Sequence, residues 1–142
     1  MSATIDFQSL RDAAKVAMTR SYAPYSRFPV GAAGITRAGR IVVGSNVENV
    51  SYGLGLCAEV SMVCSAVSLG HLSGPSDGEP ADLIAVSVCD LHGSPLTPCG
   101  RCRQVLLEFG GDDLLVDSAT GPRALRSLLP DAFGPGHLAG RR

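Results

Sequence analysis

Apolar residues recur at helical spacing near the start of the chain, over residues 6–19. Asp6 is a suitable N-cap for the predicted helix, and its apolar face would be formed by Leu10, Ala13, Ala14, Ala17 and Met18. Two apolar, partly β-branched runs follow at 30–36 and 41–45. Because the segment 37–40 between them contains a glycine, this pattern predicts a β-hairpin.

The rest of the chain alternates between helical and strand patterns. Residues 57–69 predict a helix, and residues 70–80 have the composition of a loop. The remaining predicted elements are a strand at 83–89, a helix at 99–109 ended by two glycines, a strand at 114–116, and a helix at 122–129 that begins with proline. This order predicts one α/β domain over residues 1–142, with three layers and a mixed sheet.

The helix predicted at 57–69 has no polar stripe, which is typical of a helix that is buried on all sides. A single sheet cannot cover such a helix in a chain of 142 residues that is 45% hydrophobic. The mean hydropathy of +0.20 is also high for a small protein. We therefore expect this helix to pack partly against another subunit.

Charge and targeting signals exclude several classes of partner. The net charge is -1, and no basic run is longer than Arg141-Arg142, so a nucleic-acid partner is not expected and a small neutral substrate fits better. No segment has the length of a membrane span, and the N-terminus lacks the pattern of a signal peptide, which predicts a cytoplasmic protein. The glycine- and arginine-containing tail 134–142 is expected to be mobile.

Five cysteines, an odd number, favour metal binding or catalysis over a disulfide framework. Cys99 and Cys102 have C-x₂-C spacing, and Cys57 lies two residues before Glu59. Three thiols can hold zinc and leave a fourth position open for water, with the glutamate moving protons, as in nucleobase deaminases. Positions i and i+2 point about 200° apart on a helix. Cys57 and Glu59 can therefore share a site only off a helix N-terminus, where free N–H groups offset the negative charge of the thiolates.

Two other interpretations of the cysteines remain. A lone C-x₂-C pair can be redox-active, although no thioredoxin-like context precedes it here. A structural zinc would need a fourth ligand, for which Cys64 and Cys89 are the candidates. Both fit better as core cysteines.

Three motifs occur together: Asn-Val-Glu-Asn-Val-Ser-Tyr-Gly at 46–53, Cys-Ala-Glu at 57–59 and Pro-Cys-Gly-Arg-Cys-Arg-Gln at 98–104. With them the chain strongly resembles the small homotetrameric cytidine deaminases, from about residue 22 to residue 133. The resemblance implies a three-layer α/β/α fold with a mixed sheet of about five strands. It also implies one zinc ion per chain, held by Cys57, Cys99 and Cys102, with Glu59 as proton shuttle.

The same resemblance assigns substrate contacts. Asn46 and Glu48 match the pair that binds the ribose 3′-hydroxyl, and an amide and a carboxylate two residues apart on an extended chain do face the same side. Phe28 matches the ring that flanks the pyrimidine. The other assignments are Ala58, whose backbone faces the base, Phe133, which closes the pocket of another subunit, and Tyr52, which either reaches a neighbouring pocket or is a core residue.

One position departs from the family pattern. Many members have Arg directly after the catalytic Glu, where it offsets the charge of the thiolates, and this chain has Val60. Arg103, directly after Cys102, is the nearest cation in the sequence. We expect Arg103 and the helix ends to supply the charge compensation.

The resemblance implies hydrolytic deamination of cytidine and 2′-deoxycytidine in pyrimidine salvage. A deaminase of blasticidin-type antibiotics is one alternative, although the Asn46–Glu48 pair disfavours it because such a drug lacks an ordinary ribose. A polynucleotide-editing deaminase is disfavoured by the missing basic surface. The fourth possibility, a catalytically inactive zinc-binding subunit, is disfavoured by the presence of Glu59.

Overall fold

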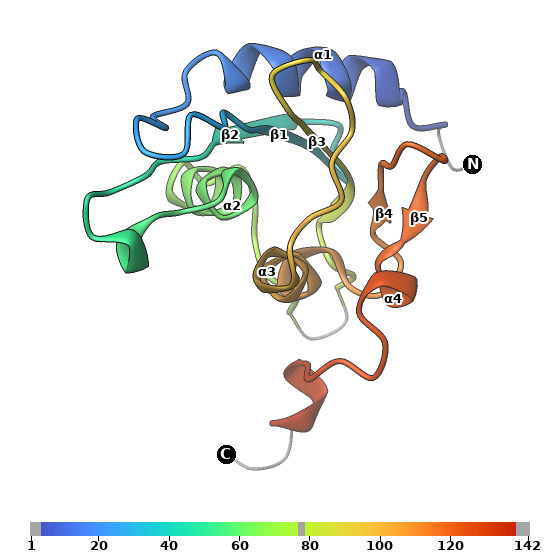
Figure 1. Cartoon of the computed structure of the whole chain (residues 1–142). Helices are drawn as coiled ribbons and strands as arrows, with labels where there is room; N and C mark the ends of the chain where they lie inside the picture. The colour runs from blue at the N-terminus through green and yellow to red at the C-terminus, as the bar shows by residue number, and fades with distance from the viewer. Residues whose placement is uncertain (1–3, 77–78, 139–142) are drawn as a thin grey trace.

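The computed structural model describes residues 4–76 and 79–138 of the chain. Its helices and strands form three layers, with α1 on one face of the sheet and α2, α3 and α4 on the other (Figure 1). The helices are α1 (Phe7–Met18), α2 (Ala58–Ser68), α3 (Gly100–Gly110) and α4 (Leu125–Leu128), with short 3₁₀ turns η1 (Tyr52–Leu54) and η2 (Pro135–His137). The strands are β1 (Gly31–Thr36), β2 (Ile41–Ser45), β3 (Leu83–Cys89), β4 (Leu115–Val116) and β5 (Arg123–Ala124).

The five strands form one mixed sheet in the order β2-β1-β3-β4-β5. β1 is antiparallel to β2 and β3, β3 is parallel to β4, and β4 is antiparallel to β5. The predicted three-layer fold with a mixed sheet of about five strands is confirmed.

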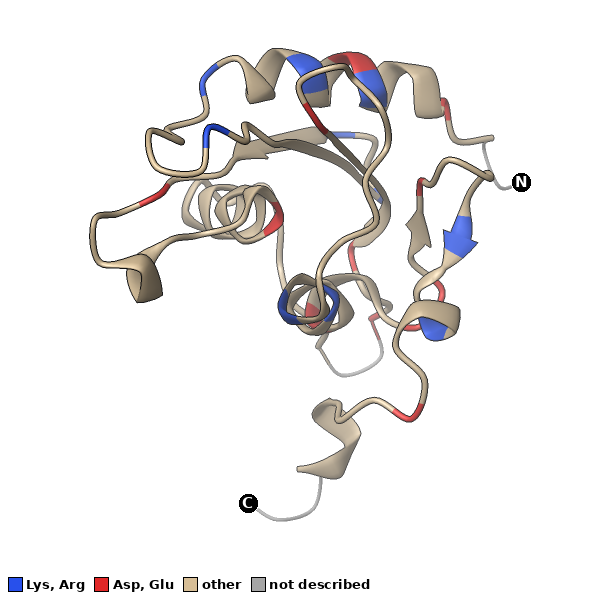
Figure 2. Ribbon diagram, viewed as in Figure 1, with Lys and Arg blue, Asp and Glu red and all other residues tan. Residues whose placement is uncertain are grey.

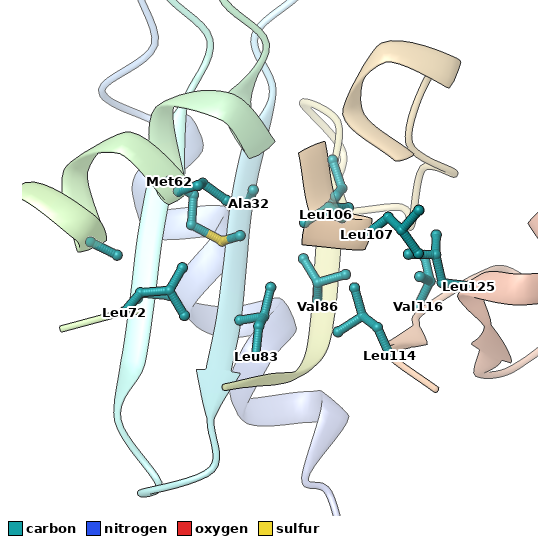
Figure 3. Close-up of a cluster of buried hydrophobic side chains, with 14 of the residues drawn as sticks. Ala32, Met62, Leu72, Leu83, Val86, Leu106, Leu107, Leu114, Val116 and Leu125 are labelled. Atoms are coloured by element: carbon teal, nitrogen blue, oxygen red, sulfur yellow. The ribbon is translucent and has the colours of Figure 1, made fainter. Parts of the chain in front are cut away.

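Alternate residues of the central strands face two separate cores. On the α1 side, Leu10 and Ala14 pack against Ala33 and Ala85. On the other side lies a larger cluster that joins the sheet to α2, α3 and α4 (Figure 3). Its labelled members are Ala32, Met62, Leu72, Leu83, Val86, Leu106, Leu107, Leu114, Val116 and Leu125. The central strands β1 and β3 are therefore buried on both faces, as the three-layer arrangement requires.

The N-terminal elements follow the sequence prediction closely. The Asp6 side chain accepts a hydrogen bond from the backbone N–H of Ser9 and caps α1. The predicted hairpin is formed by β1 and β2, and Gly39 in its turn has φ of 89°, a conformation that favours glycine.

Gly44 of β2 sets how closely α2 approaches the sheet. A Cβ atom at this position would lie 2.3 Å from the backbone nitrogen of Met62 and 2.6 Å from the carbonyl oxygen of Ala58. The first turn of α2 therefore lies directly on the strand. Because Cys57 and Glu59 flank Ala58, this contact also positions two of the predicted site residues.

The helix predicted at 122–129 is wrong in its first half. Arg123 and Ala124 form β5, which pairs with β4, and the helix α4 begins only at Leu125. The backbone N–H of Leu125 donates to the carbonyl oxygen of Leu114 at 2.8 Å, so pairing with the neighbouring strand overrides the local helix signal of Pro122.

α2 is buried on the sides that meet the sheet and α3, and the rest of its surface is uncovered. Met62, Val63 and Ala66 face the core, whereas Val67 is 43% exposed. Cys64 is exposed as well, so its interpretation as a core cysteine is wrong. It follows the fully buried Met62 by two residues, which places it about 200° around the helix. Cys89 is fully buried, as predicted. The uncovered face of α2 leaves packing against another subunit as a prediction.

Charged residues of both signs lie along α1, whereas β1, β2, β3 and β4 carry none (Figure 2). Within the described residues, none of the helices combines the length and the apolar character that crossing a membrane requires.

Candidate metal centre and pocket

The starts of two helices bring three thiols together. Cys57 is the N-cap residue of α2, Cys99 is the N-cap residue of α3, and Cys102 lies in the first turn of α3. The two helices lie side by side beneath the sheet (Figure 1). The three Sγ atoms lie within 4.8 Å of one another. The geometric prediction that both helix N-termini point at one site is confirmed.

The spacing of the thiols fits a zinc ion. The Sγ atoms of Cys57 and Cys99 are 4.0 Å apart, and those of Cys99 and Cys102 are 3.5 Å apart. Tetrahedral zinc with Zn–S bonds of about 2.3 Å requires sulfur atoms about 3.8 Å from one another. In the described part of the chain this is the one group of three or more metal-binding side chains, and neither Cys64 nor Cys89 belongs to it. A structural site with four cysteine ligands is therefore excluded for these residues.

The first turn of α3 favours negative charge at one of the three thiols, that of Cys99. Burial raises the pKa of the Cys57 and Cys102 thiols. Burial acts in the same direction on Cys99, but hydrogen bonds from the backbone N–H of Cys102 and Arg101 and from the neighbouring thiols lower its pKa overall. Because these N–H groups have no partner within the helix, the helix end can stabilise a thiolate.

Glu59 is a carboxylic acid that is almost excluded from water. It is 4% exposed, and this burial raises the pKa of its carboxyl group. Among the described residues, no Lys or Arg forms an ion pair with it. Because a buried and unpaired carboxyl group costs stability, its presence indicates a functional role.

A pocket of roughly 650 Å³ opens next to the thiols and Glu59. This volume is in the range of small-molecule binding sites. Most of the candidate residues line it, namely Phe28, Asn46, Glu48, Tyr52, Cys57, Ala58, Glu59 and Cys99. Segments far apart in the sequence therefore meet at one site.

Comparison with known proteins identifies the family. A model described as the cytidine and deoxycytidylate deaminase zinc-binding region matches residues 5–117. This chain belongs to that family. It is 53% identical over 130 residues to the cytidine deaminase of Mycobacterium tuberculosis (strain H37Rv), with 92% of this chain and 91% of that protein covered. A probable cytidine deaminase of Dictyostelium discoideum is 39% identical, with coverage of 86% and 80%.

Solved structures agree with this assignment. The crystal structure of cytidine deaminase from Mycobacterium tuberculosis aligns with a TM-score of 0.82, covering 92% of this chain and 99% of that one. That from Mycobacterium leprae aligns with a TM-score of 0.81 at 44% identity, covering 90% and 100%. This chain is thus a zinc-binding deaminase domain, and the three thiols are a group that can hold the ion.

Asn46 and Glu48 line the pocket, and the side chains of both form hydrogen bonds with the segment that precedes β1. Glu48 Oε1 accepts the backbone N–H groups of Tyr25 and Ser26 at 2.9 and 3.1 Å. Hydrogen bonds from Ser26 lower the pKa of the Glu48 carboxyl group. The amide of Asn46 bonds to Phe28 and Val30. The sequence reasoning missed Tyr25 and Ser26, which lie in the segment that resembles the family but carry no recognisable motif of their own.

Tyr52 lies at the outer rim of the pocket. It is 81% exposed, and its ring packs edge-to-face on Tyr25 with centroids 6.0 Å apart. The alternative of a buried core tyrosine is therefore wrong. Its position in η1, which projects from the body of the domain, explains the exposure.

Phe133 does not line the pocket of its own chain. It is 61% exposed, its carbonyl oxygen accepts a hydrogen bond from Gln104 at 2.7 Å, and its ring stacks on His137. It therefore lies beside α3, in the C-terminal segment. Of the tail predicted to be mobile, residues 139–142 lie outside the described residues, and residues 135–137 form η2.

Arg103 is bonded to carbonyl groups and not to the thiols. Its Nε donates to Pro98 and its Nη1 to Leu128, both at 2.7 Å. Among the described hydrogen bonds, none joins Arg103 to Cys57, Cys99 or Cys102. Its charge can therefore act on the thiols only through space, and its role as compensating cation stays a prediction.

Proposed function

We propose that this protein hydrolyses cytidine and 2′-deoxycytidine to uridine and 2′-deoxyuridine, with release of ammonia, in pyrimidine salvage. The observation that carries the proposal is the meeting of three thiols and the buried Glu59 at a pocket whose wall also holds Asn46 and Glu48. Relatives named cytidine deaminase support it, with 53% and 39% identity.

Zinc, held by Cys57, Cys99 and Cys102, would lower the pKa of a water molecule so that hydroxide is available near neutral pH. Glu59 takes a proton from the attacking water and delivers it to ring N3, which makes C4 electrophilic. A C4–O bond then forms. Glu59 then takes the remaining proton from the new C4 hydroxyl and delivers it to the amino group as the C4–N bond breaks, so that the C4 carbonyl forms, ammonia leaves and the carboxylate is regenerated.

The remaining wall of the pocket orients the nucleoside. Ala58 is fully buried and is the first residue of α2, so its backbone N–H lacks a helical partner and can bond to the base. Phe28 flanks the pyrimidine ring. Glu48 keeps its second carboxylate oxygen available for the ribose 3′-hydroxyl, since the described hydrogen bonds use only Oε1. Asn46 shares that contact.

The active protein is proposed to be a cytoplasmic homotetramer in which neighbouring subunits complete each pocket. Two features of the single chain support this. Val67 and Leu69 leave an apolar side of α2 uncovered, being 43% and 65% exposed. Phe133 does not line the pocket of its own chain and is exposed, so it is available to another.

The test is a direct assay of the purified, zinc-loaded protein with cytidine, blasticidin and free cytosine, followed by ultraviolet absorbance. We expect turnover of cytidine only. Glu59→Gln should keep about one zinc per chain but lose turnover. No absorbance change with cytidine at full zinc content would refute the proposed function, and substantial activity of Glu59→Gln would refute the role of this residue.

A further inference from the structure

The pocket wall that carries Phe28 has no regular secondary structure. Residues 27–30 lie between a turn and β1, and Arg27 has a positive φ of 56°, which is unfavourable for a residue other than glycine. Phe28 itself is 53% exposed, so core packing does not hold its ring. The conformation of this segment must therefore be held by other contacts.

The side chain of Asn46 supplies two of those contacts, beside the hydrogen bonds from the Phe28 N–H to Ser26 Oγ and from the Asn46 N–H to the carbonyl oxygen of Val30. Its Nδ2 donates to the carbonyl oxygen of Phe28 at 2.9 Å, and its Oδ1 accepts the backbone N–H of Val30 at 2.9 Å. The Ser21 hydroxyl donates to the same oxygen. One amide group thus joins both sides of the Phe28–Pro29–Val30 segment, in the way that a neighbouring strand would.

This network fixes the orientation of the amide. A flipped side chain would bring two donors together at Val30 and two acceptors together at Phe28. A side-chain amide can accept two hydrogen bonds and donate two. Ser21 and Val30 use both acceptor positions and Phe28 uses one donor, so one N–H of Asn46 remains for a ligand.

We propose that Asn46 is a positioning residue for the Phe28 ring, in addition to any contact it makes with the sugar. This inference rests on the proposed function, because it concerns the wall of the same pocket. Its consequence is specific: loss of the Asn46 amide weakens the use of a pyrimidine nucleoside even when the nucleoside has no 3′-hydroxyl. A residue that only binds the hydroxyl would have no such effect.

The experiment compares cytidine with 3′-deoxycytidine as substrates of the wild-type protein, Asn46→Ala, Phe28→Ala and the double variant. We expect Asn46→Ala to lower kcat/KM by roughly tenfold or more for both substrates, mainly through KM. In the Phe28→Ala background the same substitution should change kcat/KM for 3′-deoxycytidine by less than about threefold, because the ring to be positioned is gone. Normal use of 3′-deoxycytidine by Asn46→Ala, or effects of the two substitutions that simply multiply, would overturn the proposal.

A second measurement does not depend on turnover. Arg27 is exposed, and trypsin can cleave the bond between Arg27 and Phe28 only when this segment opens. We expect cleavage after Arg27, followed by mass spectrometry, to be at least about fivefold faster in Asn46→Ala than in the wild type. Unchanged cleavage would overturn the proposal.

Asp6→Ala is the matched control for both measurements. It removes the cap of α1, far from the pocket, and lowers global stability without altering the Phe28 segment. It should therefore change neither the ratio of the two substrates nor the cleavage after Arg27. If the wild-type protein does not deaminate cytidine, the proposed function fails, and the trypsin measurement still decides whether Asn46 holds the segment.

Discussion

The ion pair between Arg11 and Asp117 offers a sharp test of how this domain is held together. Asp117 follows β4 directly and is fully buried, whereas the side chain of Arg11, on α1, is 33% exposed. Arg11 donates two hydrogen bonds to the carboxylate, of 2.7 and 2.8 Å, and the Ser87 hydroxyl of β3 donates a third of 2.8 Å. The pair therefore ties α1 to the two central strands that meet in parallel.

The two partners should differ in the cost of their removal. Arg11→Met leaves a buried carboxylate without its cation, and such changes cost about 3–5 kcal/mol. We expect the lower end of that range, because Arg11 itself has access to water and Ser87 still donates. In Asp117→Asn the amide oxygen can still accept a hydrogen bond from Arg11, and water can also reach the Arg11 guanidinium. The Ser87 hydroxyl can rotate and accept a hydrogen bond from the new amide N–H. This variant should lose only about 1–2 kcal/mol.

The pH dependence has a defined sign. Burial acts to raise the pKa of Asp117, but the hydrogen bonds from Arg11 and Ser87 hold it below its ordinary value. In the wild type, the contribution of the pair to the free energy of unfolding is therefore complete above about pH 4 and is lost as the pH falls further. In Arg11→Met the contacts with Arg11 are lost and only the hydrogen bonds from Ser87 and Ser118 still oppose the effect of burial, so we expect the pKa of Asp117 to rise above its ordinary value. The difference in free energy of unfolding between this variant and the wild type should therefore become smaller as the pH falls from about 8 to about 5, because protonation removes the uncompensated buried charge.

The assay is urea unfolding at fixed protein concentration with excess zinc, so that subunit assembly and metal binding are equal among the variants. Equal losses for the two variants, or a larger loss for Asp117→Asn, would show that desolvation of the carboxylate does not dominate. If the loss of unfolding free energy in Arg11→Met stays constant with pH, the loss does not come from a buried Asp117 carboxylate without its cation.

Three further predictions concern the metal centre and its support. Gly44→Ala should lower the free energy of unfolding, measured with urea, by about 3 kcal/mol or more, because a Cβ atom 2.3 Å from the backbone nitrogen of Met62 forces α2 away from the sheet. Gly136→Ala is the control: a Cβ atom there has no atom within 4 Å, so this variant should be nearly as stable as the wild type. Arg103→Met should speed the transfer of zinc to a chromophoric chelator several-fold. Arg103→Lys should restore zinc retention only in part, because an ammonium group cannot reach two carbonyl groups as the guanidinium does. If both variants retain zinc as well as the wild type, Arg103 does not contribute to the metal site. Treatment with a strong chelator should abolish turnover and lower the midpoint of thermal unfolding, and one equivalent of zinc should restore both.

Local patterns were sufficient to predict most elements, and the deaminase signature, with the family resemblance, predicted the metal group. α1, the hairpin and β3 have clear periodicity, and the spacing of Cys99 and Cys102 is a local motif. The position of Cys57 followed from helix geometry, because an i, i+2 pair can share a site only at a helix end. These predictions needed no knowledge of which segments meet in space.

The features that could not be predicted depend on partners far along the chain. Arg11 and Asp117 are 106 positions apart, and β5 exists because β4 is there to pair with it. The exposed side of α2 could not be found from its composition, since an apolar pattern does not say which face meets the sheet. Asn46 could be recognised as a polar residue of the site, but its bonds to Phe28 and Val30 depend on how the preceding loop folds back.

The same distinction bears on the charge of the metal group. The missing arginine at Val60 suggested that another cation would replace it, and Arg103 was the nearest candidate in the sequence. In three dimensions the two described hydrogen bonds of Arg103 go to carbonyl groups, and one of these belongs to Pro98, directly before Cys99. The backbone N–H groups at the start of α3, together with the neighbouring thiols, lower the pKa of Cys99. Helix ends can thus compensate the negative charge of a site with three thiolates, while Arg103 stabilises the segment that carries Cys99 through its hydrogen bond to Pro98.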